Sequence, residues 1–236
     1  MLKFFSRAFL APLVRVLFRA SVKGASNVPR EGAVILASNH LSFIDSVVIT
    51  LLAPRTVSFL AKDSYFTGKG FKGWLSRSFF RSIGAIPVTR GVGQAAQAAL
   101  DSGLELLDND KAFAIYPEGT RSLDGRLYRG RTGVAWLALQ SGAPVVPVGL
   151  KGTNRVQPPG SKGIRLAKIS VSFGKALDLS RHGKADSGRA RRHATDEVMD
   201  AIQAQSGQKR ADSYNEPPAK NIVEKVRRRL LDRFRL

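Results

Sequence analysis

The sequence contains no cysteine, which excludes a disulfide scaffold, a thiolate metal site and a cysteine nucleophile. Acidic residues are scarce: 18 Asp and Glu stand against 38 Lys and Arg in 236 residues, a formal net charge of +20. Hydrophobic residues still make up 43% of the chain, enough for a packed core, so disorder of the whole chain is not expected. Such a positive charge predicts contact with phosphate, on nucleic acid, on anionic lipid or on a small substrate.

No stretch of the sequence is typical of a transmembrane helix, which needs roughly 20 mostly apolar residues. The longest stretch without a charged side chain, residues 132–150, contains three glycines and two prolines and predicts a helix, a turn and a strand. The N-terminus does not resemble a cleaved signal peptide, because Arg7 and Arg15 interrupt its apolar residues. We therefore expect any membrane contact to be peripheral.

The N-terminus, residues 1–24, predicts an amphipathic helix that associates with membranes. Residues 1–30 carry six Lys and Arg and no acid. On a helix over residues 2–20, the basic side chains gather on one arc and most of the large apolar ones lie opposite. The basic residues are Lys3, Arg7, Arg15 and Arg19, and the apolar ones are Phe5, Phe9, Leu10, Leu13, Val16 and Leu17. This pattern is typical of a helix in a membrane interface, and an amphipathic helix packed on its own domain is the alternative.

The C-terminus, residues 206–236, predicts a linker followed by a second basic helix. Residues 206–219 are polar and contain two adjacent prolines. Residues 221–234 then place apolar side chains at every fourth position opposite a run of Lys and Arg. A helix on a membrane surface, a helix that binds a partner and an arm that binds nucleic acid all fit this pattern.

Residues 25–205 predict a single α/β domain. Short β-rich runs alternate with helical stretches, which favours a largely parallel sheet flanked by helices. The expected strands are residues 33–37, 57–61, 85–88, 112–116, 144–150 and 168–173. The expected helices are residues 71–81, 94–107, 132–140 and 187–205.

Only three histidines are present, and His40 differs from the other two: it follows an apolar strand, and Asp45 lies five residues further on. If the chain turns from strand to helix between them, the carboxylate can bond one ring nitrogen and hold the other in its basic tautomer. Such a pair can take a proton from a hydroxyl at neutral pH. A purely structural His–Asp bond, or a helix cap by Asp45, fits the same spacing. His182 and His193 lie in a polar stretch and are expected to be solvated.

The sequence lacks the motifs that would supply a nucleophile or a metal. There is no G-x-S-x-G elbow and no H-E-x-x-H or comparable cluster, and Ser42 lies in the same short turn as His40, poorly placed for attack. We therefore expect no metal site and no covalent enzyme intermediate. The group that His40 activates is then a substrate hydroxyl, which attacks an acyl donor directly.

Three cations end or follow predicted strands, and such strand ends are where α/β sheets bind ligands. They are Lys62, Arg90 and Arg121, the last within the Pro-Glu-Gly-Thr-Arg-Ser segment at residues 117–122. Arginine can bind a phosphate with two parallel hydrogen bonds. Together the three cations predict a phosphate pocket beside His40, although each taken singly is more often a surface charge.

Four blocks resemble the glycerolipid acyltransferases, the family that includes 1-acylglycerol-3-phosphate acyltransferase. They are Asn-His-x4-Asp at residues 39–45, residues 84–90, Pro-Glu-Gly-Thr-Arg-Ser at residues 117–122, and residues 144–148. The resemblance covers roughly residues 30–175. A lone His-x4-Asp is weak evidence, whereas four blocks in this order and spacing are strong.

The resemblance implies a mixed sheet with an N-terminal membrane-associating portion. It also implies acyl transfer from acyl-CoA or acyl carrier protein, as co-substrates and without a cofactor. His40 matches the general base and Asp45 the residue that orients it. The positions implied to bind the acceptor are Lys62, Arg90, Glu118, Gly119, Thr120 and Arg121. The block at residues 144–148 matches one linked to the donor side or to structural support, with a plain buried strand as the alternative.

From these observations we expect a lysophospholipid acceptor, 1-acylglycerol 3-phosphate, and phosphatidic acid as the product of a step in phospholipid biosynthesis. We expect a peripheral enzyme on an anionic membrane, at the cytoplasmic face of the cell membrane. Glycerol 3-phosphate, a lysophosphatidylglycerol or a glycolipid are the alternative acceptors.

Two interpretations from other classes compete with this one. Residues 91–96 fit the G-x-G-x-x-A pattern of a dinucleotide-binding turn, but no second nucleotide-binding half is evident. The charge alone also fits a non-enzymatic module that binds membranes or nucleic acid. That interpretation leaves the His40–Asp45 pair unexplained, and the aromatic residues do not interleave with Lys and Arg as in common RNA-binding strands. We therefore expect no nucleic-acid partner.

Overall fold

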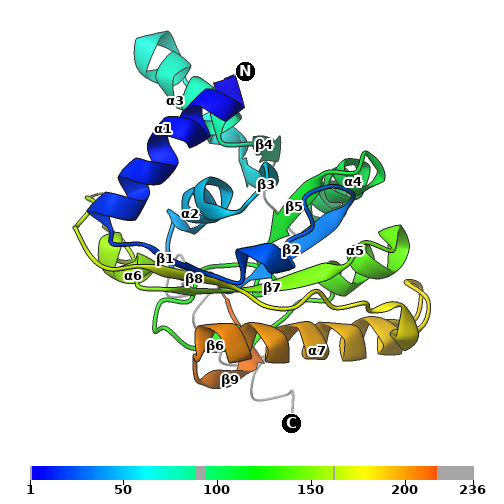
Figure 1. Ribbon diagram of the computed structural model, residues 1–236. Helices are drawn as coiled ribbons and strands as arrows, with labels where there is room; N and C mark the ends of the chain where they lie inside the picture. Colours follow the sequence, from blue (N-terminus) through cyan, green and yellow to red (C-terminus); the bar gives the residue numbers. More distant parts are fainter. Residues whose placement is uncertain (1, 89–93, 162, 217–236) are drawn as a thin grey trace, which may run out of the picture.

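A seven-stranded β-sheet runs through the structure, a computed structural model that describes residues 2–88, 94–161 and 163–216 (Figure 1). Within these residues the strand order is β1-β8-β7-β2-β5-β3-β4, and β6 and β9 form a separate two-stranded sheet. The strands are β1 (Ser21–Lys23), β2 (Val34–Ser38), β3 (Val57–Lys62), β4 (Ala85–Val88), β5 (Ala112–Ile115), β6 (Leu127–Arg129), β7 (Val145–Lys151), β8 (Ser170–Phe173) and β9 (Arg210–Tyr214).

The large sheet is mixed and mostly parallel, which confirms the fold class expected from the sequence. β2 pairs in parallel with β5 on one side and β7 on the other, so that Leu36 stands opposite Ala114 and Val146. β3 and β4 continue the parallel order beyond β5. The β7–β8 pairing is antiparallel, so β8 and its parallel neighbour β1 run opposite to the other strands described in this sheet.

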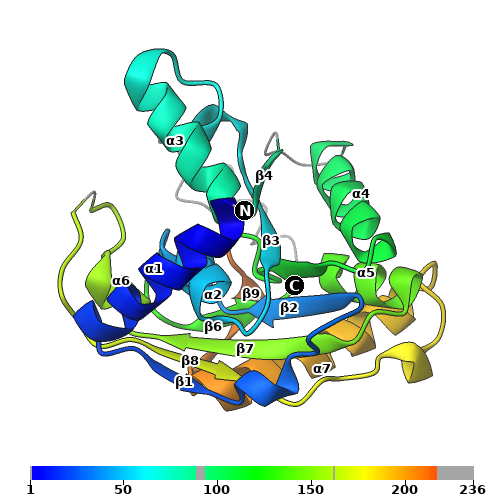
Figure 2. The same ribbon diagram turned by 45° about the horizontal axis from the view of Figure 1, so that its top comes forward.

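Helices cover both faces of this sheet (Figures 1 and 2). The described helices are α1 (Leu2–Leu17), α2 (Asp45–Leu52), α3 (Gly70–Ser82), α4 (Gln94–Asp108), α5 (Gly133–Ser141), α6 (Thr153–Val156) and α7 (Gly188–Ser206). Three short 3-10 turns are η1 (Ala25–Asn27), η2 (Asp63–Tyr65) and η3 (Ser180–His182). α1, α2, α3 and α6 contribute to one hydrophobic core, and α4, α5 and α7 contribute to the other.

Strand β2 contributes to both cores and ends at the centre of the sheet. Its five residues are all buried, with Val34 and Leu36 in one core and Ile35 and Ala37 in the other. Successive side chains of a strand point to opposite faces, so a strand covered on both faces is apolar along its length. The polar residues that follow β2 therefore emerge at the carboxyl edge of the parallel strands.

Both ends of the chain differ from the expected organisation. α1 ends at Leu17, and β1 lies before the boundary expected at residue 24 but pairs with β8, so it belongs to the sheet. The segment expected as a linker, residues 206–219, contains β9, which pairs with β6. Pairing with an available neighbour can make a strand of a polar segment. The basic helix expected over residues 221–234 lies outside the described residues.

Candidate active site

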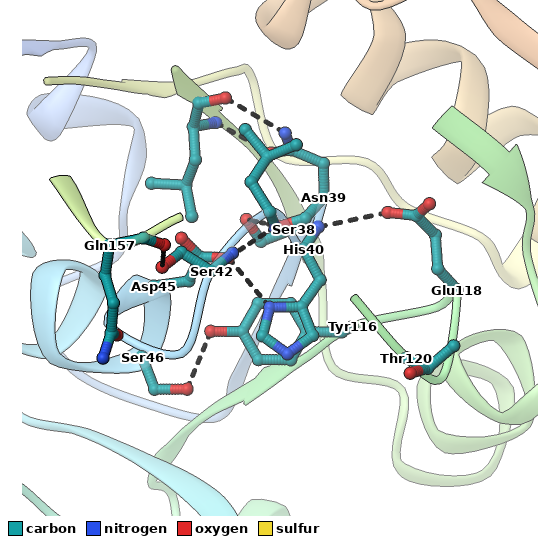
Figure 3. Close-up of polar contacts among 12 residues, drawn as sticks. Ser38, Asn39, His40, Ser42, Asp45, Ser46, Tyr116, Glu118, Thr120 and Gln157 are labelled. Carbon is teal, nitrogen blue, oxygen red and sulfur yellow. Dashed lines mark hydrogen bonds and ion pairs between the residues drawn. The ribbon is translucent and has the colours of Figure 1, made fainter. Parts of the chain in front are cut away.

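The structure brings His40 and Asp45 together. His40 follows β2, Asp45 is the first residue of α2, and the imidazole Nδ1 lies 2.8 Å from the carboxylate Oδ2 (Figure 3). Asp45 is fully buried, whereas 12% of the His40 side chain is exposed. A carboxylate at Nδ1 favours the tautomer that carries its proton there and leaves Nε2, on the opposite edge of the ring, as the basic nitrogen.

Asp45 is itself held by the turn that precedes it. Its Oδ2 also accepts the backbone N–H groups of Leu41, at 2.6 Å, and Ser42, at 2.8 Å. The first turn of a helix favours a negative charge, so the carboxylate and its helix stabilise each other. The Ser42 hydroxyl donates to the carbonyl of Gln157 at 2.8 Å. The orientation of His40 is thus fixed by a carboxylate that cannot easily move.

An aromatic side chain covers one face of the imidazole. Tyr116, directly after β5, stacks on His40 with ring centroids 3.9 Å apart and ring planes at 12°. Its hydroxyl shares a 2.8 Å hydrogen bond with the hydroxyl of Ser46 in the first turn of α2. The ring of His40 is therefore confined at its edge and at its face. No role for Tyr116 or Ser46 was predicted from the sequence, where the one available signal was an aromatic residue at a strand end.

The backbone of His40 is bonded on both sides to the loop of residues 117–122. Its N–H donates to Oε1 of Glu118 at 3.1 Å, and its carbonyl accepts the N–H of Ser122 at 2.8 Å. The second oxygen of Glu118, Oε2, accepts the N–H of Tyr128 in β6 at 3.0 Å. Glu118 thus joins the turn after β2, its own loop and β6.

Burial controls the ionisation of Glu118. The side chain has no exposed surface, and desolvation raises the pKa of its carboxyl from 4.5 to about 7. The N–H groups of Tyr128 and His40 oppose this rise, and the negative charge of Asp45 adds to it. The resemblance implies that Glu118 binds the acceptor. In the structure both of its oxygens face backbone amides, so its direct effect is on the position of His40.

The next residue of the loop, Gly119, allows close approach of a second arginine. Gly119 has a φ of +76°, and its N–H donates to the carbonyl of Tyr116 at 2.9 Å. A Cβ added there would lie 3.0 Å from Nε of Arg131, whose backbone N–H in turn donates to the carbonyl of Pro117. Arg131 therefore packs against the loop, a contact that was not predicted from the sequence.

The other predicted acceptor-binding residues that the structure describes lie at the ends of strands or in the 117–122 loop. Arg121 is exposed, and Thr120 is half-buried with its carbonyl accepting Nδ2 of Asn215 at 3.2 Å. Lys62 is exposed at the carboxyl end of β3, which is separated from β2 by β5. Arg90, like the glycines of the alternative nucleotide-binding turn, falls within residues 89–93, outside the described residues.

Asn39, beside His40, links β2 to β7. Its amide exchanges two hydrogen bonds with the backbone of Leu150, at 2.8 and 3.0 Å, and also donates to Oε1 of Gln208 at 2.7 Å. The block at residues 144–148 falls at the start of β7, whose described residues are buried up to Leu150. The burial of these residues favours the structural interpretation of that block.

His182 corrects a sequence expectation. It was expected to be solvated, but its Nε2 lies 2.6 Å from Oε2 of Glu197 and its side chain is 19% exposed. The contact forms because η3 packs against α7, and the intervening 15 positions hid it in the sequence. The expectation for His182 was therefore wrong.

The arrangement around His40 suits general base catalysis. A proton acceptor must have a fixed tautomer and lie within reach of a hydroxyl, and a partly exposed imidazole backed by a buried carboxylate meets the first need. Arg121, Arg131 and Lys62 supply positive charge at the same edge. Among the described residues, no group of three or more His, Asp or Glu side chains gathers to hold a metal ion.

Comparison with known proteins places the chain in a family. A model of the family described as Acyltransferase matches residues 19–151. Two chloroplastic proteins named 1-acyl-sn-glycerol-3-phosphate acyltransferase, BAT2 of Brassica napus and LPAT1 of Arabidopsis thaliana, are each 30% identical to the chain over 163 residues. These alignments cover 68% of the chain and 45% and 44% of the two relatives.

The fold has a counterpart among solved structures. The crystal structure of the 1-acyl-sn-glycerophosphate (LPA) acyltransferase PlsC from Thermotoga maritima superposes with a TM-score of 0.62 at 22% identity. The match covers 86% of this chain and 82% of that one. With the family model spanning more than half of the sequence, the chain belongs to the acyltransferase family. It spans less than half the length of the two plant relatives.

Proposed function

We propose that the protein transfers a fatty acyl group from acyl-CoA or acyl carrier protein to the free hydroxyl of 1-acylglycerol 3-phosphate, giving phosphatidic acid. The observation that carries the proposal is the 2.8 Å contact between Nδ1 of His40 and the buried Asp45, beside a loop that carries Arg121. The names of the two plant relatives support the choice of acceptor.

The reaction needs one proton carrier and no covalent enzyme intermediate. Nε2 of His40 takes the proton of the acceptor hydroxyl as its oxygen attacks the thioester carbonyl. Asp45 stabilises the imidazolium that forms, through Nδ1. When the C–S bond breaks, the imidazolium returns the proton to the departing thiolate. The products are an oxygen ester and a free thiol, and His40 is neutral again.

The acceptor phosphate is bound by cations around the 117–122 loop. Lys62, Arg90 and Arg121 are the residues proposed from the sequence, and the contact of Arg131 with the loop supports adding it to them. Gly119 and Thr120 contribute the backbone that lets a phosphate approach. Glu118 acts by holding His40 and the loop together.

The protein works at the surface of an anionic membrane, on the cytoplasmic face of the cell membrane. α1 supports this proposal, because large apolar side chains remain exposed on it together with Arg15, and Arg19 is exposed just after the helix. The exposed apolar residues are Phe9, Leu13, Val16 and Leu17. In the described part of the chain, no helix combines the length and apolarity needed to cross a bilayer.

An acceptor and donor panel tests the proposed reaction. Purified protein is mixed with radiolabelled acyl-CoA or acyl carrier protein and with each acceptor in turn, and the lipid products are separated. We expect phosphatidic acid from 1-acylglycerol 3-phosphate, and none when His40→Ala replaces the wild type. If only glycerol 3-phosphate, lysophosphatidylglycerol or a glycolipid is acylated, that molecule is the acceptor and 1-acylglycerol 3-phosphate is not. Absence of any acylated product would contradict the proposed reaction.

A further inference from the structure

Helix α3 has two apolar faces, and only one of them is used by the fold. Phe80 is buried in the core, and Gly73 packs so closely on Gly68 that an added Cβ would lie 2.0 Å from the Gly68 carbonyl oxygen. The opposite face exposes four large apolar side chains at helical spacing. They are Phe71 (75% exposed), Trp74 (54%), Leu75 (55%) and Phe79 (37%).

Basic side chains flank this exposed stripe on both sides. At about 100° per residue, Lys72 falls beside Phe79 on one side, and Arg77 and Arg81 fall beside Trp74 on the other. α3 contains no acidic residue. An apolar stripe rich in Trp, Phe and Leu between two cationic rims complements the acyl chains and phosphates of an anionic bilayer, and an aromatic ring with a polar edge is favoured at that depth.

The helix that carries the stripe lies next to α1, whose exposed apolar residues support the proposed membrane surface. α1 and α3 are in contact and lie on the same side of the sheet (Figures 1 and 2). Eight of the large apolar side chains exposed in the described residues belong to these two helices. Scattered single apolar residues are normal on a surface, but four large ones at helical spacing on one face of α3 mark an interaction site.

The buried face of α3 connects the stripe to the catalytic turn. Phe80 stacks on Tyr65 with ring centroids 4.7 Å apart, and both rings contact Phe43 edge-on, at 6.3 and 5.6 Å. Phe43 lies between His40 and Asp45 in the sequence. One layer of aromatic rings therefore separates the exposed stripe from the turn that carries the base.

We propose that α3 is a second membrane-docking helix, which inserts Phe71, Trp74, Leu75 and Phe79 into the interface of an anionic bilayer. This inference rests on the membrane association in the proposed function and adds a surface to it. Docking through α3 sets His40 next to the bilayer that holds a lysophospholipid acceptor.

The two tryptophans make the test direct, because one lies on the stripe and the other, Trp136, packs against the α4–α5–α7 core. In the Trp136→Phe protein, Trp74 is the one remaining tryptophan, so the tryptophan emission reports on the stripe alone. With vesicles of phosphatidylglycerol and phosphatidylcholine we expect its emission to shift to shorter wavelength and to be quenched by lipids brominated on the acyl chain. The Trp74→Phe protein, which keeps Trp136, is the matched control and should show neither change.

The charged rim gives a second measurement that does not depend on fluorescence. Reversing one cation near an anionic surface should weaken vesicle binding by about fivefold or more. We expect this loss for Lys72→Glu in a sedimentation assay, and no comparable loss for Lys184→Glu, an exposed lysine in the turn between η3 and α7. Circular dichroism of each variant separates loss of binding from loss of fold.

Three results would overturn the proposal. Trp74 could keep a solvent-exposed emission on protein that sediments with vesicles, or the protein could fail to bind vesicles at all. Trp74 could also shift at high protein concentration without lipid, which would assign the stripe to a second copy of the chain. These measurements need no acyl donor, so insertion of Trp74 without phosphatidic acid synthesis would contradict the proposed function and leave α3 docking intact.

Discussion

The peptide N–H of His40 donates to the carboxylate of Glu118, a residue without exposed surface, 78 positions away in the sequence. The bond joins the turn that carries the proposed base to the loop that carries Arg121. Because Ser122 donates to the carbonyl of the same histidine, the two segments can move only together. The position of His40 thus depends on a carboxylate that takes no part in the proposed proton transfer.

Glu118 should make stability depend on pH in a definite direction. Its pKa in the folded protein is about 7, above the 4.5 of an unperturbed glutamate, so the folded state holds this proton more tightly. The protonated Glu118 therefore stabilises the folded state relative to the unfolded state. This contribution is fully present below pH 4.5 and is lost as the pH rises through 7. The rise in the pKa of Glu118 corresponds to about 3 kcal/mol in the free energy of unfolding.

Urea unfolding of wild type and Glu118→Gln across this pH range checks the prediction. We expect the free energy of unfolding of wild type to fall, relative to the variant, by about 3 kcal/mol between pH 4.5 and 7. In the variant, the NH2 group of the introduced glutamine can replace the oxygen that accepts the Tyr128 N–H. The loss of that hydrogen bond should lower the free energy of unfolding by about 1–3 kcal/mol at any pH. Two curves that run parallel would refute the assigned ionisation.

Tyr116 should act as a positioning residue for His40 through its ring more than through its hydroxyl. Tyr116→Phe keeps the stacked face and loses the bond to Ser46, so we expect kcat to fall by about fivefold or less, an effect of about 1 kcal/mol. Tyr116→Leu removes the stack and frees the imidazole, so we expect a loss of kcat of roughly tenfold to a hundredfold with little change in KM.

Ser46→Ala is the matched control, because it breaks the same hydroxyl bond from the other side. It should resemble Tyr116→Phe, and the double variant should be no worse than either one. The pH dependence of kcat should shift in Tyr116→Leu and stay unchanged in Tyr116→Phe. Equal kinetics for the Phe and Leu variants would argue against a positioning role for the ring.

Gly119→Ala should destabilise the fold and disturb Arg131. An alanine at φ +76° is strained, and its Cβ would press on Nε of Arg131 at 3.0 Å. We expect a cost of about 1–2 kcal/mol in thermal or urea unfolding. Gly125→Ala, at φ +79° with nothing within 4 Å of the added Cβ, is the matched control. It should show the backbone strain alone, while only Gly119→Ala should also raise KM for the acceptor.

Arg121 should contribute to acceptor binding. We expect Arg121→Ala to raise KM for 1-acylglycerol 3-phosphate by about tenfold, the loss of one charge-assisted contact, with a smaller effect on KM for the acyl donor. Arg189→Ala removes the same charge from the exposed start of α7 and should change neither constant. Equal effects of the two variants on KM would show that Arg121 contributes only through the overall positive charge and does not bind the acceptor directly.

The sequence predicted most of the sheet because its central strands are apolar and end at polar residues. The His40–Asp45 contact was also predictable, since a strand, a turn and a helix at that spacing bring the two side chains together. The helix assumed for that contact, α2, was not predicted from its own residues: its β-branched sequence favours a strand by propensity, and tertiary packing overrides it. β9 was missed because a polar strand that pairs with one short neighbour has no apolar alternation.

Contacts between side chains and distant backbone could not be predicted. The motif identifies Glu118, but whether its carboxylate faces substrate or the amides of His40 and Tyr128 is decided by how the 117–122 loop folds over β2. The stacking of Tyr116 on His40 likewise depends on the register of β5 against β2. The contact between His182 and Glu197 was also unpredictable, because it depends on the packing of η3 on α7.

The central claim is that His40, oriented by Asp45, is the base of an acyl transfer. The most direct test is the rate of phosphatidic acid formation from acyl-CoA and 1-acylglycerol 3-phosphate by four proteins: wild type, His40→Ala, Asp45→Asn and His182→Ala. His182 is also partly buried and paired with a carboxylate, so it controls for the loss of such a histidine. We predict losses of kcat of roughly 10²–10⁴-fold for the first two variants and wild-type rates for His182→Ala. A His40→Ala protein that retains wild-type activity would contradict the mechanism.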